Sequence, residues 1–252
     1  MSRTSIVRVV PLTFGWEYLD RSVALDGYPT GTTDLIPIPG FALERADGSL
    51  ILFDTGFDPE ADPAELASPG LPPPEVVPLP EALTGRGYSV GQVECVILSH
   101  LMVDHAGDLK TLKPGTRVWV QSAEWEYATG PAINRRGYRE KDLDGISVEF
   151  EMLDGEAEPW IGVRLIPTPG HCIGHQSALV QLEGGPVLLA ADASDLLTNL
   201  EQRVAPGLLL YGREAALASI DRLKRIISEN PGTRIIPGHD PEVWGDLPEA
   251  FT

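Results

Sequence analysis

Short apolar segments separated by glycine and proline recur along most of this chain, and that pattern restricts its fold more than any other feature. The segment from Val93 to Ser99 is almost unbroken in its apolar character, which is typical of a strand buried on both faces. The segment from Arg213 to Asn230 instead repeats apolar residues at helical spacing and stops at Pro231-Gly232. Strands interleaved with helices predict α/β layers rather than an all-β sandwich.

The same patterns predict the remaining elements. Ala46-Asp47-Gly48 indicates a hairpin turn between two strands. We interpret Asp62 to Pro80, which is rich in proline, alanine and glutamate, as an irregular surface loop that could cover a site. The other predicted strands are Ser5 to Leu12, Ile36 to Glu44, Leu50 to Phe53, Val118 to Val120, Val148 to Leu153, Val163 to Pro167, Ser177 to Leu182, Val187 to Ala191 and Thr233 to Ile236, and the other predicted helices are Glu81 to Gly87, Ser122 to Tyr127 and Arg139 to Asp144.

The charge of the chain excludes several classes of partner. Its 252 residues include 19 Lys+Arg and 37 Asp+Glu, which gives a formal net charge of −18. Nucleic-acid binders and polybasic membrane anchors need clustered cations, and no basic run here is longer than Arg135-Arg136. We therefore expect neither a nucleic-acid partner nor a membrane partner. The N-terminus lacks an apolar signal core and the two cysteines lack framework spacing, so we expect a cytoplasmic protein.

A weak internal echo relates the two halves of the chain. The strand ending at Phe53 is followed by Asp54, and the strand ending at Ala191 is followed by Asp192. In the same way, the strand before Ser99 leads to His100, and the strand before Gly238 leads to His239. The echo predicts a similar sheet in each half, with polar residues at matching strand ends.

All five histidines lie outside the clearly predicted helices and strands, at positions 100, 105, 171, 175 and 239. A single histidine in such a place is usually a surface or capping residue. Four that adjoin glycine or aspartate at strand ends indicate a site, because strand ends distant in sequence meet at one edge of a sheet. Imidazole and carboxylate groups gathered there match the ligands of zinc and similar divalent ions.

The segment from His100 to His105 has His100, Met102 and Asp104 at alternating positions and His105 directly after them, and it resembles the His-x-His-x-Asp-His signature of the metallo-β-lactamase superfamily. Four further blocks of the family have counterparts in the expected order: Ile51 to Gly56, Thr168 to Ser177, Ala191 to Ala193, and Pro237 to Asp240. The stretch from Phe53 to Pro59 and the ending Gly238-His239-Asp240-Pro241 are most similar to the N-acyl-homoserine lactone lactonase branch. The resemblance implies an α/β fold of the four-layer αβ/βα sandwich type, a single domain over residues 1–252, and a metal site at one edge of the sandwich.

The resemblance also implies a set of metal ligands. The second site would take Asp104, His105, Asp192 and His239, and this set is complete. The first site would take His100, His171 and the shared Asp192, with Met102 where the family has another histidine. The implied cofactor is Zn²⁺, one or two ions per chain, with Mn²⁺ or Fe²⁺ as alternatives.

Met102 is the most informative departure from the family. A thioether is a soft, neutral donor that serves Zn²⁺ poorly and Mn²⁺ worse. The chain could hold one metal in the second site, or two with the first bound more weakly, or it could be a degenerate member without activity. We favour an enzyme with one metal or with a weakened first site.

Four residues near the expected ligands have competing interpretations. Asp195 stands where the lactonase branch usually has a tyrosine, and we interpret it as the N-cap of a helix starting at Leu196 rather than as a ligand or proton donor. His175 is not a metal ligand in the family, and we expect it to orient its loop. We expect Cys172 to be a small buried residue and Asp54 to hold a ligand imidazole by its N–H.

The function that the resemblance implies is metal-dependent hydrolysis of a small-molecule lactone or ester. A bound cation lowers the pKa of its water from about 15.7 toward 7, and the resulting hydroxide attacks the carbonyl. Asp104 and Asp192 are the candidate catalytic residues, the first as a proton acceptor and the second as the residue that holds or bridges the metal. The alternatives are a thioesterase, an aryl ester hydrolase, and a non-catalytic protein that binds a small molecule. We expect a monomer or homodimer whose specificity comes from residues 57–80 and from Trp125 to Tyr138.

Overall fold

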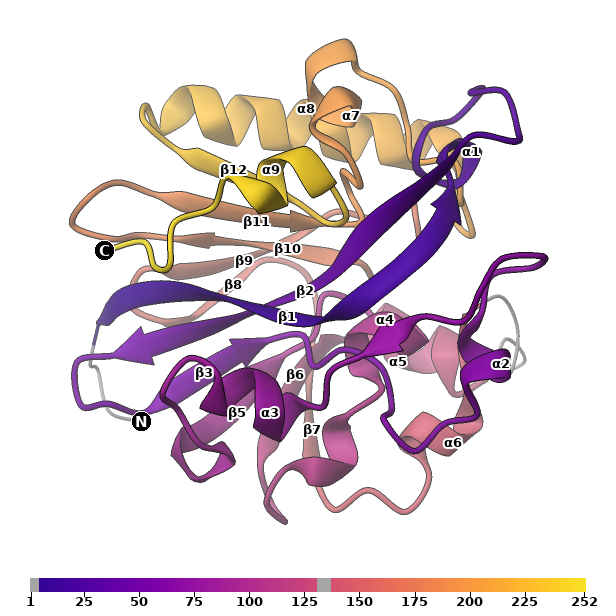
Figure 1. Cartoon of the computed structure of the whole chain (residues 1–252). Helices are drawn as coiled ribbons and strands as arrows, with labels where there is room; N and C mark the ends of the chain where they lie inside the picture. Colours follow the sequence, from indigo (N-terminus) through magenta and orange to yellow (C-terminus); the bar gives the residue numbers. More distant parts are fainter. Residues whose placement is uncertain (1–4, 131–136) are drawn as a thin grey trace.

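The computed structural model describes residues 5–130 and 137–252, and in it two β-sheets pack face to face between layers of helices (Figure 1). The predicted α/β class and four-layer αβ/βα sandwich are therefore confirmed. Among the described residues, no helix is long and apolar enough to cross a membrane.

The larger sheet has seven strands and combines antiparallel and parallel pairs. β1, β2 and β3 are antiparallel neighbours, whereas β3, β5, β6 and β7 run parallel. In spatial order the strands are β4 (Glu75–Val76), β1 (Ile6–Asp20), β2 (Thr33–Arg45), β3 (Leu50–Phe53), β5 (Val93–Ile97), β6 (Arg117–Gln121) and β7 (Glu149–Leu153).

The smaller sheet has five described strands; β11 and β12 pair in parallel, and the other neighbours pair antiparallel. In spatial order they are β12 (Arg234–Pro237), β11 (Val187–Ala191), β10 (Gln176–Val180), β9 (Val163–Pro167) and β8 (Ala157–Trp160).

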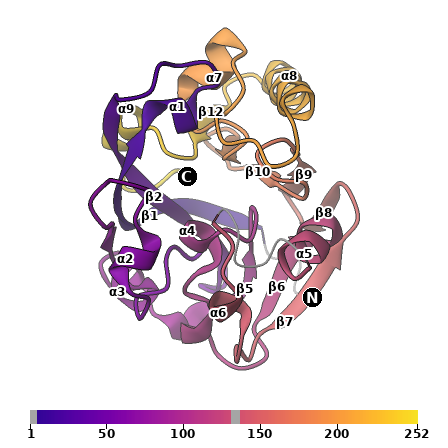
Figure 2. The ribbon, with the colours of Figure 1, turned by 90° about the vertical axis from the view of Figure 1, so that its right-hand side faces the viewer.

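Helices cover the outer face of each sheet. In Figure 1, α8 lies beyond the smaller sheet at the top of the molecule and α3 lies on the opposite side, and the same layering is visible end-on in Figure 2. The helices are α1 (Arg21–Ala24), α2 (Pro63–Leu66), α3 (Leu79–Thr84), α4 (Val103–Ala106), α5 (Ser122–Ala128), α6 (Glu140–Leu143), α7 (Leu197–Gln202), α8 (Arg213–Glu229) and α9 (Pro241–Gly245), with short 3₁₀ helices at Val90–Gln92 and Leu109–Thr111.

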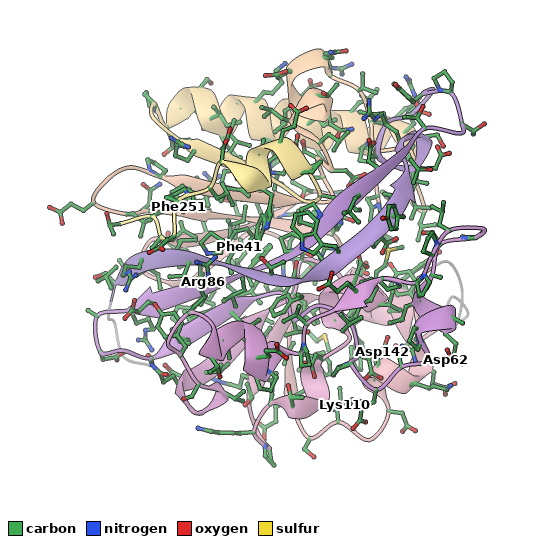
Figure 3. All side chains as sticks on the ribbon, in the orientation of Figure 1. Phe41, Asp62, Arg86, Lys110, Asp142 and Phe251 are labelled. Atoms are coloured by element: carbon green, nitrogen blue, oxygen red, sulfur yellow. The ribbon has the colours of Figure 1, made fainter. Side chains whose placement is uncertain are left out.

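Three apolar cores separate the four layers. The middle core lies between the sheets and includes Phe41 and Phe53, and the C-terminal Phe251 packs against it (Figure 3). A second core fills the space between the larger sheet and its helices, and a third packs Ile220 and Leu223 of α8 against the smaller sheet. Burial of apolar surface on both faces explains why the strands read as nearly continuous apolar runs.

Most predicted elements are confirmed, with boundary shifts of a few residues. The strands at Leu50–Phe53, Val163–Pro167 and Val187–Ala191 have the predicted limits, and α8 ends one residue before Asn230. The hairpin turn is confirmed, and Gly48 adopts a φ of 82° there. Such an angle favours glycine because a Cβ would be strained.

The first strand is much longer than predicted. β1 continues past Leu12 to Asp20 and pairs with β2 along almost its whole length, with a register shift between Thr13 and Gly15. Gly15 has a φ of 143°, and a Cβ there would lie 1.8 Å from the carbonyl oxygen of Glu75 in β4. The bulge lets the strand bend and continue beyond Gly15, which the apolar pattern of the sequence does not reveal.

The internal echo is present in the structure as two parallel strand pairs. β3 and β5 form one pair and β11 and β12 form the other, each with aspartate after the first strand and histidine beyond the second. The chain leaves β3 and β11 through non-glycine residues with positive φ, 64° at Asp54 and 45° at Ala191. Such strained positions tend to persist where the surrounding structure needs an exact orientation, and both lie beside the predicted site.

The interpretation of Asp62 to Pro80 as a wholly irregular loop is wrong in detail. The segment contains α2 and β4, and α3 begins within it at Leu79. The short helix begins because the Asp62 side chain accepts a hydrogen bond from the Ala64 amide and Pro63 follows the cap. Of the other segment expected to set specificity, Trp125 to Tyr138, residues 131–136 lie outside the described residues.

Candidate metal centre

The residues expected to bind metal converge where β3, β5, β11 and β12 end. His100 follows β5, Asp192 follows β11 and His239 follows β12, while His171 lies between β9 and β10. His105 lies inside the single-turn helix α4, so the expectation that all five histidines lie outside helices is wrong for this one. Each of the five histidines is buried.

The second site brings two carboxylates together with two imidazoles. His105 Nε2 lies 3.2 Å from Asp104 Oδ2 and 3.3 Å from Asp192 Oδ1. His239 Nε2 lies 3.3 Å from the same oxygen of Asp192 and 3.7 Å from Asp104 Oδ2. Asp104, His105 and His239 form one of the groups of the described residues whose ligand atoms all lie within 4.8 Å of one another.

The residues expected at the first site lie around the other oxygen of Asp192. Asp192 Oδ2 lies 3.5 Å from His171 Nε2 and 3.9 Å from His100 Nε2. One carboxylate therefore turns one oxygen toward each set of histidines, which is the arrangement expected of a residue shared by two sites. Met102 is buried beside them, and its sulfur lies 3.1 Å from His171 Nε2. Met102 therefore lies beside one of the imidazoles expected at the first site.

Groups outside the site hold the imidazoles by their other nitrogen. His105 Nδ1 lies 2.9 Å from Asp54 Oδ2, which is the contact predicted for Asp54. His239 Nδ1 donates to the carbonyl of Pro37 at 3.0 Å, and His171 Nδ1 donates to the carbonyl of Leu208 at 3.1 Å. Such support fixes the ring so that Nε2 is the atom left for a cation.

The site contains buried polar atoms that the described protein groups leave unsatisfied. His100 Nε2 and Asp195 Oδ1 are buried and have no hydrogen-bond partner among the described residues. His105 Nε2 and Asp192 Oδ1 lie 3.3 Å apart but do not form a well-aligned hydrogen bond. An unpaired buried polar atom costs about 1–3 kcal/mol. Imidazole nitrogens and carboxylate oxygens oriented toward one another are the donor set of Zn²⁺ and related ions, so the residues present fit the implied cofactor.

The two sites differ in their electrostatics. Burial lowers the pKa of His239, but Asp192 and Asp104 outweigh it and raise that pKa to about 10. Burial likewise opposes protonation of His105, and Asp104 and Asp192 hold its pKa well above the ordinary value. At the first site, burial lowers the pKa of His100 and of His171.

A cavity of about 830 Å³ opens onto the site. Asp104, His171, Asp192 and His239 form its polar end. Its walls come from β1, α1, β2, α2 and the residues after it, the segment that leads into α6 and the segment between α7 and α8. The apolar residues of these walls include Leu19, Val23, Ile36, Leu66, Pro69 and Leu208. The expectation that residues 57–80 contribute to the pocket is met by residues 65–69.

The interpretation of Asp195 as a helix cap is wrong. The N-cap of α7 is Leu196, and the first amide of the helix, that of Leu197, donates instead to Asp240 Oδ2 at 2.9 Å. Because a distant aspartate caps the helix, Asp195 is free to line the cavity. Burial and the neighbouring Asp192 raise the pKa of Asp195 well above its ordinary range.

Two glutamates at or beside the site were not predicted from the sequence. Glu17 of β1 lines the cavity, where burial raises its pKa to about 7 and the Ser68 hydroxyl donates to it at 3.0 Å. Glu124 of α5 is fully buried and accepts from the amides of Leu101 and Gly174, at 3.0 and 3.1 Å, so it joins the two histidine-bearing loops. Neither lies in a family block, and a buried glutamate in a short helix has no signal in a single sequence.

His175 and Cys172 lie in the loop of His171. Cys172 is fully buried, as predicted. His175 is also fully buried, and its carbonyl accepts from the Thr168 amide at 2.8 Å, so the expected role in holding this loop agrees with its contacts.

Comparison with known proteins identifies the family of this chain. The metallo-β-lactamase superfamily matches residues 41–239. The chain belongs to this superfamily. A curated N-acyl homoserine lactonase from Bacillus cereus is 32% identical over 236 residues, which cover 89% of each chain. The N-acyl homoserine lactonase AttM of Rhizobium johnstonii is 34% identical over 172 residues, which cover 65% of this chain and 64% of that protein.

Solved structures of superfamily members share the arrangement over nearly the whole chain. An N-acyl homoserine lactone hydrolase with N-hexanoyl-L-homoserine at its catalytic metal centre superposes with a TM-score of 0.84, at 29% identity, over 97% of each chain. A variant of AiiA from B. thuringiensis with N-decanoyl-L-homoserine bound at its active site gives the same TM-score at 28% identity, again over 97% of each chain. The sequence-based resemblance to this superfamily and its lactonases is confirmed.

Proposed function

We propose that this protein is a metal-dependent lactonase whose substrates are N-acyl homoserine lactones or lactones of similar size. The observation that carries the proposal is the cavity, whose lining combines Asp104, Asp192 and His239 with apolar side chains such as Leu19, Ile36 and Leu66. A lactone ring would lie at the polar end, and an acyl chain would lie against side chains such as Leu19 and Leu66. The curated and structural relatives act on or bind molecules of this kind.

The candidate ligands are His100, His171 and Asp192 for a first ion and Asp104, His105, Asp192 and His239 for a second. We propose Zn²⁺ as the ion, with the second site occupied first because its ligand set is complete. When bound, such an ion supplies Lewis acidity and makes a water molecule acidic enough to attack a carbonyl at neutral pH. We also propose that residues 1–252 form one domain.

The carboxylates of the site have distinct roles in this proposal. Asp192 shares its two oxygens between the sites and fixes the spacing of the imidazoles. Asp104 lies beside His105 and His239 at the polar end of the cavity, where it can accept the proton released during attack. Asp195 lines the same end with an unpartnered oxygen and stands where the lactonases have tyrosine, so it is placed to hydrogen-bond the substrate.

Ring opening can be measured directly because each hydrolysed lactone releases a proton. Zinc-loaded protein is expected to hydrolyse N-hexanoyl and N-decanoyl homoserine lactone, and chelated protein is expected to be inactive. Aryl esters and a thioester serve as competing substrates in the same assay. Turnover of a thioester or aryl ester without any lactone hydrolysis would contradict the proposal.

A further inference from the structure

His175 is a buried histidine whose second nitrogen has no role in the family pattern. The side chain is fully buried, and its Nε2 has no hydrogen-bond partner among the described residues. A residue that served only to hold its loop would not need an unpaired nitrogen in the protein interior, because such a nitrogen carries a desolvation cost.

A chain of hydroxyl groups fixes the proton position on this ring. The Ser177 hydroxyl donates to the carbonyl of Ala190 at 2.8 Å, and a hydroxyl has only one hydrogen to donate. Ser177 Oγ must therefore accept from the Thr168 hydroxyl, which lies 2.9 Å away. Thr168 Oγ1 must in turn accept from His175 Nδ1 at 2.8 Å. The neutral ring thus carries its proton on Nδ1 and presents a bare lone pair at Nε2.

The four histidines expected at the metal sites also carry a proton on Nδ1. His105, His171 and His239 donate from Nδ1 to a carboxylate or carbonyl. His100 Nδ1 lies 3.0 Å from Ser99 Oγ, and that hydroxyl donates to Asp54, so His100 must be the donor to Ser99. Orientation by the Nδ1–H is the usual arrangement of a metal-binding imidazole. His175 has this arrangement without having been assigned a metal.

His175 lies among the residues expected at the first site. One ring nitrogen of His175 forms, with one ligand atom each of His100 and Asp192, a group in which all atoms lie within 4.8 Å of one another. The ring centroids of His100 and His175 lie 5.3 Å apart. Ligand atoms of a tetrahedral zinc site with bonds near 2.1 Å are about 3.4 Å apart, so a small inward movement would bring the three atoms to bonding distance.

Met102 is a poor substitute for the histidine that the family has at this position. His171 donates from Nδ1 to Leu208, so its Nε2 and the sulfur of Met102 present lone pairs to each other at 3.1 Å. A cation in that space would relieve the contact, but a neutral thioether contributes little to binding Zn²⁺.

We propose that His175 Nε2 is a ligand of the first metal site and replaces the imidazole that position 102 lacks. His100, His175 and Asp192 would form the buried side of this site, and His171 would close it toward the cavity. The first site is then rebuilt with a different histidine rather than lost. This inference rests on the proposed metal-dependent function.

The direct test is nitrogen NMR of the metal-free protein labelled with ¹⁵N-histidine and titrated with Zn²⁺. Before zinc is added, His175 is expected to show a protonated Nδ1 and a bare Nε2. As the second equivalent of zinc binds, the Nε2 resonance of His175 is expected to move to the range of coordinated nitrogen. An Nε2 resonance that stays unchanged through two equivalents would overturn the inference.

Two variants separate His175 from Met102. The side chain in His175→Asn keeps a donor toward Thr168 and removes the ligand atom, whereas Met102→Leu removes the sulfur and keeps the bulk. Loss of a group that only supports a ligand typically costs 10–100-fold in metal affinity, so His175→Asn is expected to weaken the first site at least about 100-fold. Met102→Leu is expected to leave the zinc stoichiometry at two.

Thermal unfolding of both metal-free variants checks that they fold. If Met102→Leu loses the zinc of the first site and His175→Asn keeps it, the ligand is the thioether of Met102 and the inference is overturned. A wild-type protein that binds only one zinc would overturn it and leave the lactonase proposal intact. A wild-type protein that binds no zinc and hydrolyses no lactone would overturn both.

Discussion

The two candidate metal sites bury their imidazoles in opposite electrostatic surroundings. In the second site, Asp104 and Asp192 surround His105 and His239 and raise the pKa values of these imidazoles, although burial opposes this. In the first site, burial has a larger effect than the neighbouring charges. It lowers the pKa of His175 to about 3 and also lowers the pKa of His100. Without metal, one half therefore holds protons and the other holds bare nitrogen lone pairs.

This difference teaches how the two sites should respond to a cation. Zinc must displace protons to enter the carboxylate-rich site, so its affinity there should fall steeply as the pH is lowered. Zinc entering the imidazole-rich site displaces few protons, and its affinity depends mainly on how many nitrogens reach it. The replacement of a family histidine by Met102 affects only the zinc affinity of this imidazole-rich site.

The largest expected effect comes from removing a ligand of the carboxylate-rich site. His239→Ala is expected to lower lactone turnover by at least about 10³-fold, because metal-dependent activation of water is lost together with the ion. Turnover and zinc content are measured on the same preparation and compared with those of the wild-type protein. Undiminished turnover would show that the complete ligand set is not the catalytic one.

A smaller effect is expected from Asp54→Asn. The carboxylate accepts from His105 Nδ1, from the Ser99 amide and from the Ser99 hydroxyl, and an amide cannot accept from all three donors. Zinc affinity at the second site is expected to fall 10–100-fold, as for other supporting groups. Calorimetric titration gives both affinities. An equal or larger loss at the first site would contradict the assignment of Asp54 to His105.

Met102→His tests the first site by restoring the family residue. If His175 already supplies a nitrogen, the added imidazole is expected to increase zinc affinity at the first site only about tenfold, within the range of supporting effects. The second site is expected to be unchanged. Zinc affinities that do not change at either site would mean that position 102 does not face the metal.

The pH dependence of stability of the metal-free protein should separate the two halves with opposite signs. His175 is neutral in the folded protein, so its contribution is present above the unfolded pKa near 6.5 and is lost as the pH falls toward 3. His239 is protonated in the folded protein, so its contribution is present below 6.5 and is lost as the pH rises toward 10.

Chemical unfolding of wild type, His175→Asn and His239→Asn across this range measures both contributions. The difference between wild type and His175→Asn is expected to change only below pH 6.5, with a slope of up to about 1.4 kcal/mol per pH unit. The difference for His239→Asn is expected to change only above it. Two differences with the same sign and pH range would remove the electrostatic distinction between the sites.

The sequence predicted much of the site because its residues follow strands. His100, Asp192 and His239 each come within a few residues of a buried apolar run, and the ends of parallel strands must meet at one edge. The same logic explains why the echo between the halves corresponds to real parallel pairs. Helix α8 was predicted within one residue because a long amphipathic segment with a clear stop needs no tertiary information.

Other parts of the site depend on contacts that no local pattern contains. Asp195 lines the cavity because Asp240, 45 positions further along the chain, caps the helix that Asp195 was expected to cap. Glu17 reaches the cavity because β1 continues through the bulge at Gly15. The proton position on His175 is set by Thr168, Ser177 and the carbonyl of Ala190, which only the pairing of the smaller sheet brings together.

The most direct test of the whole account is to titrate the metal-free protein with Zn²⁺ while measuring hydrolysis of N-hexanoyl homoserine lactone. The account predicts that turnover appears with the first equivalent, which fills the site of Asp104, His105 and His239, and reaches its plateau at two equivalents. No lactone hydrolysis at any zinc loading, in protein shown to bind the metal, would contradict it.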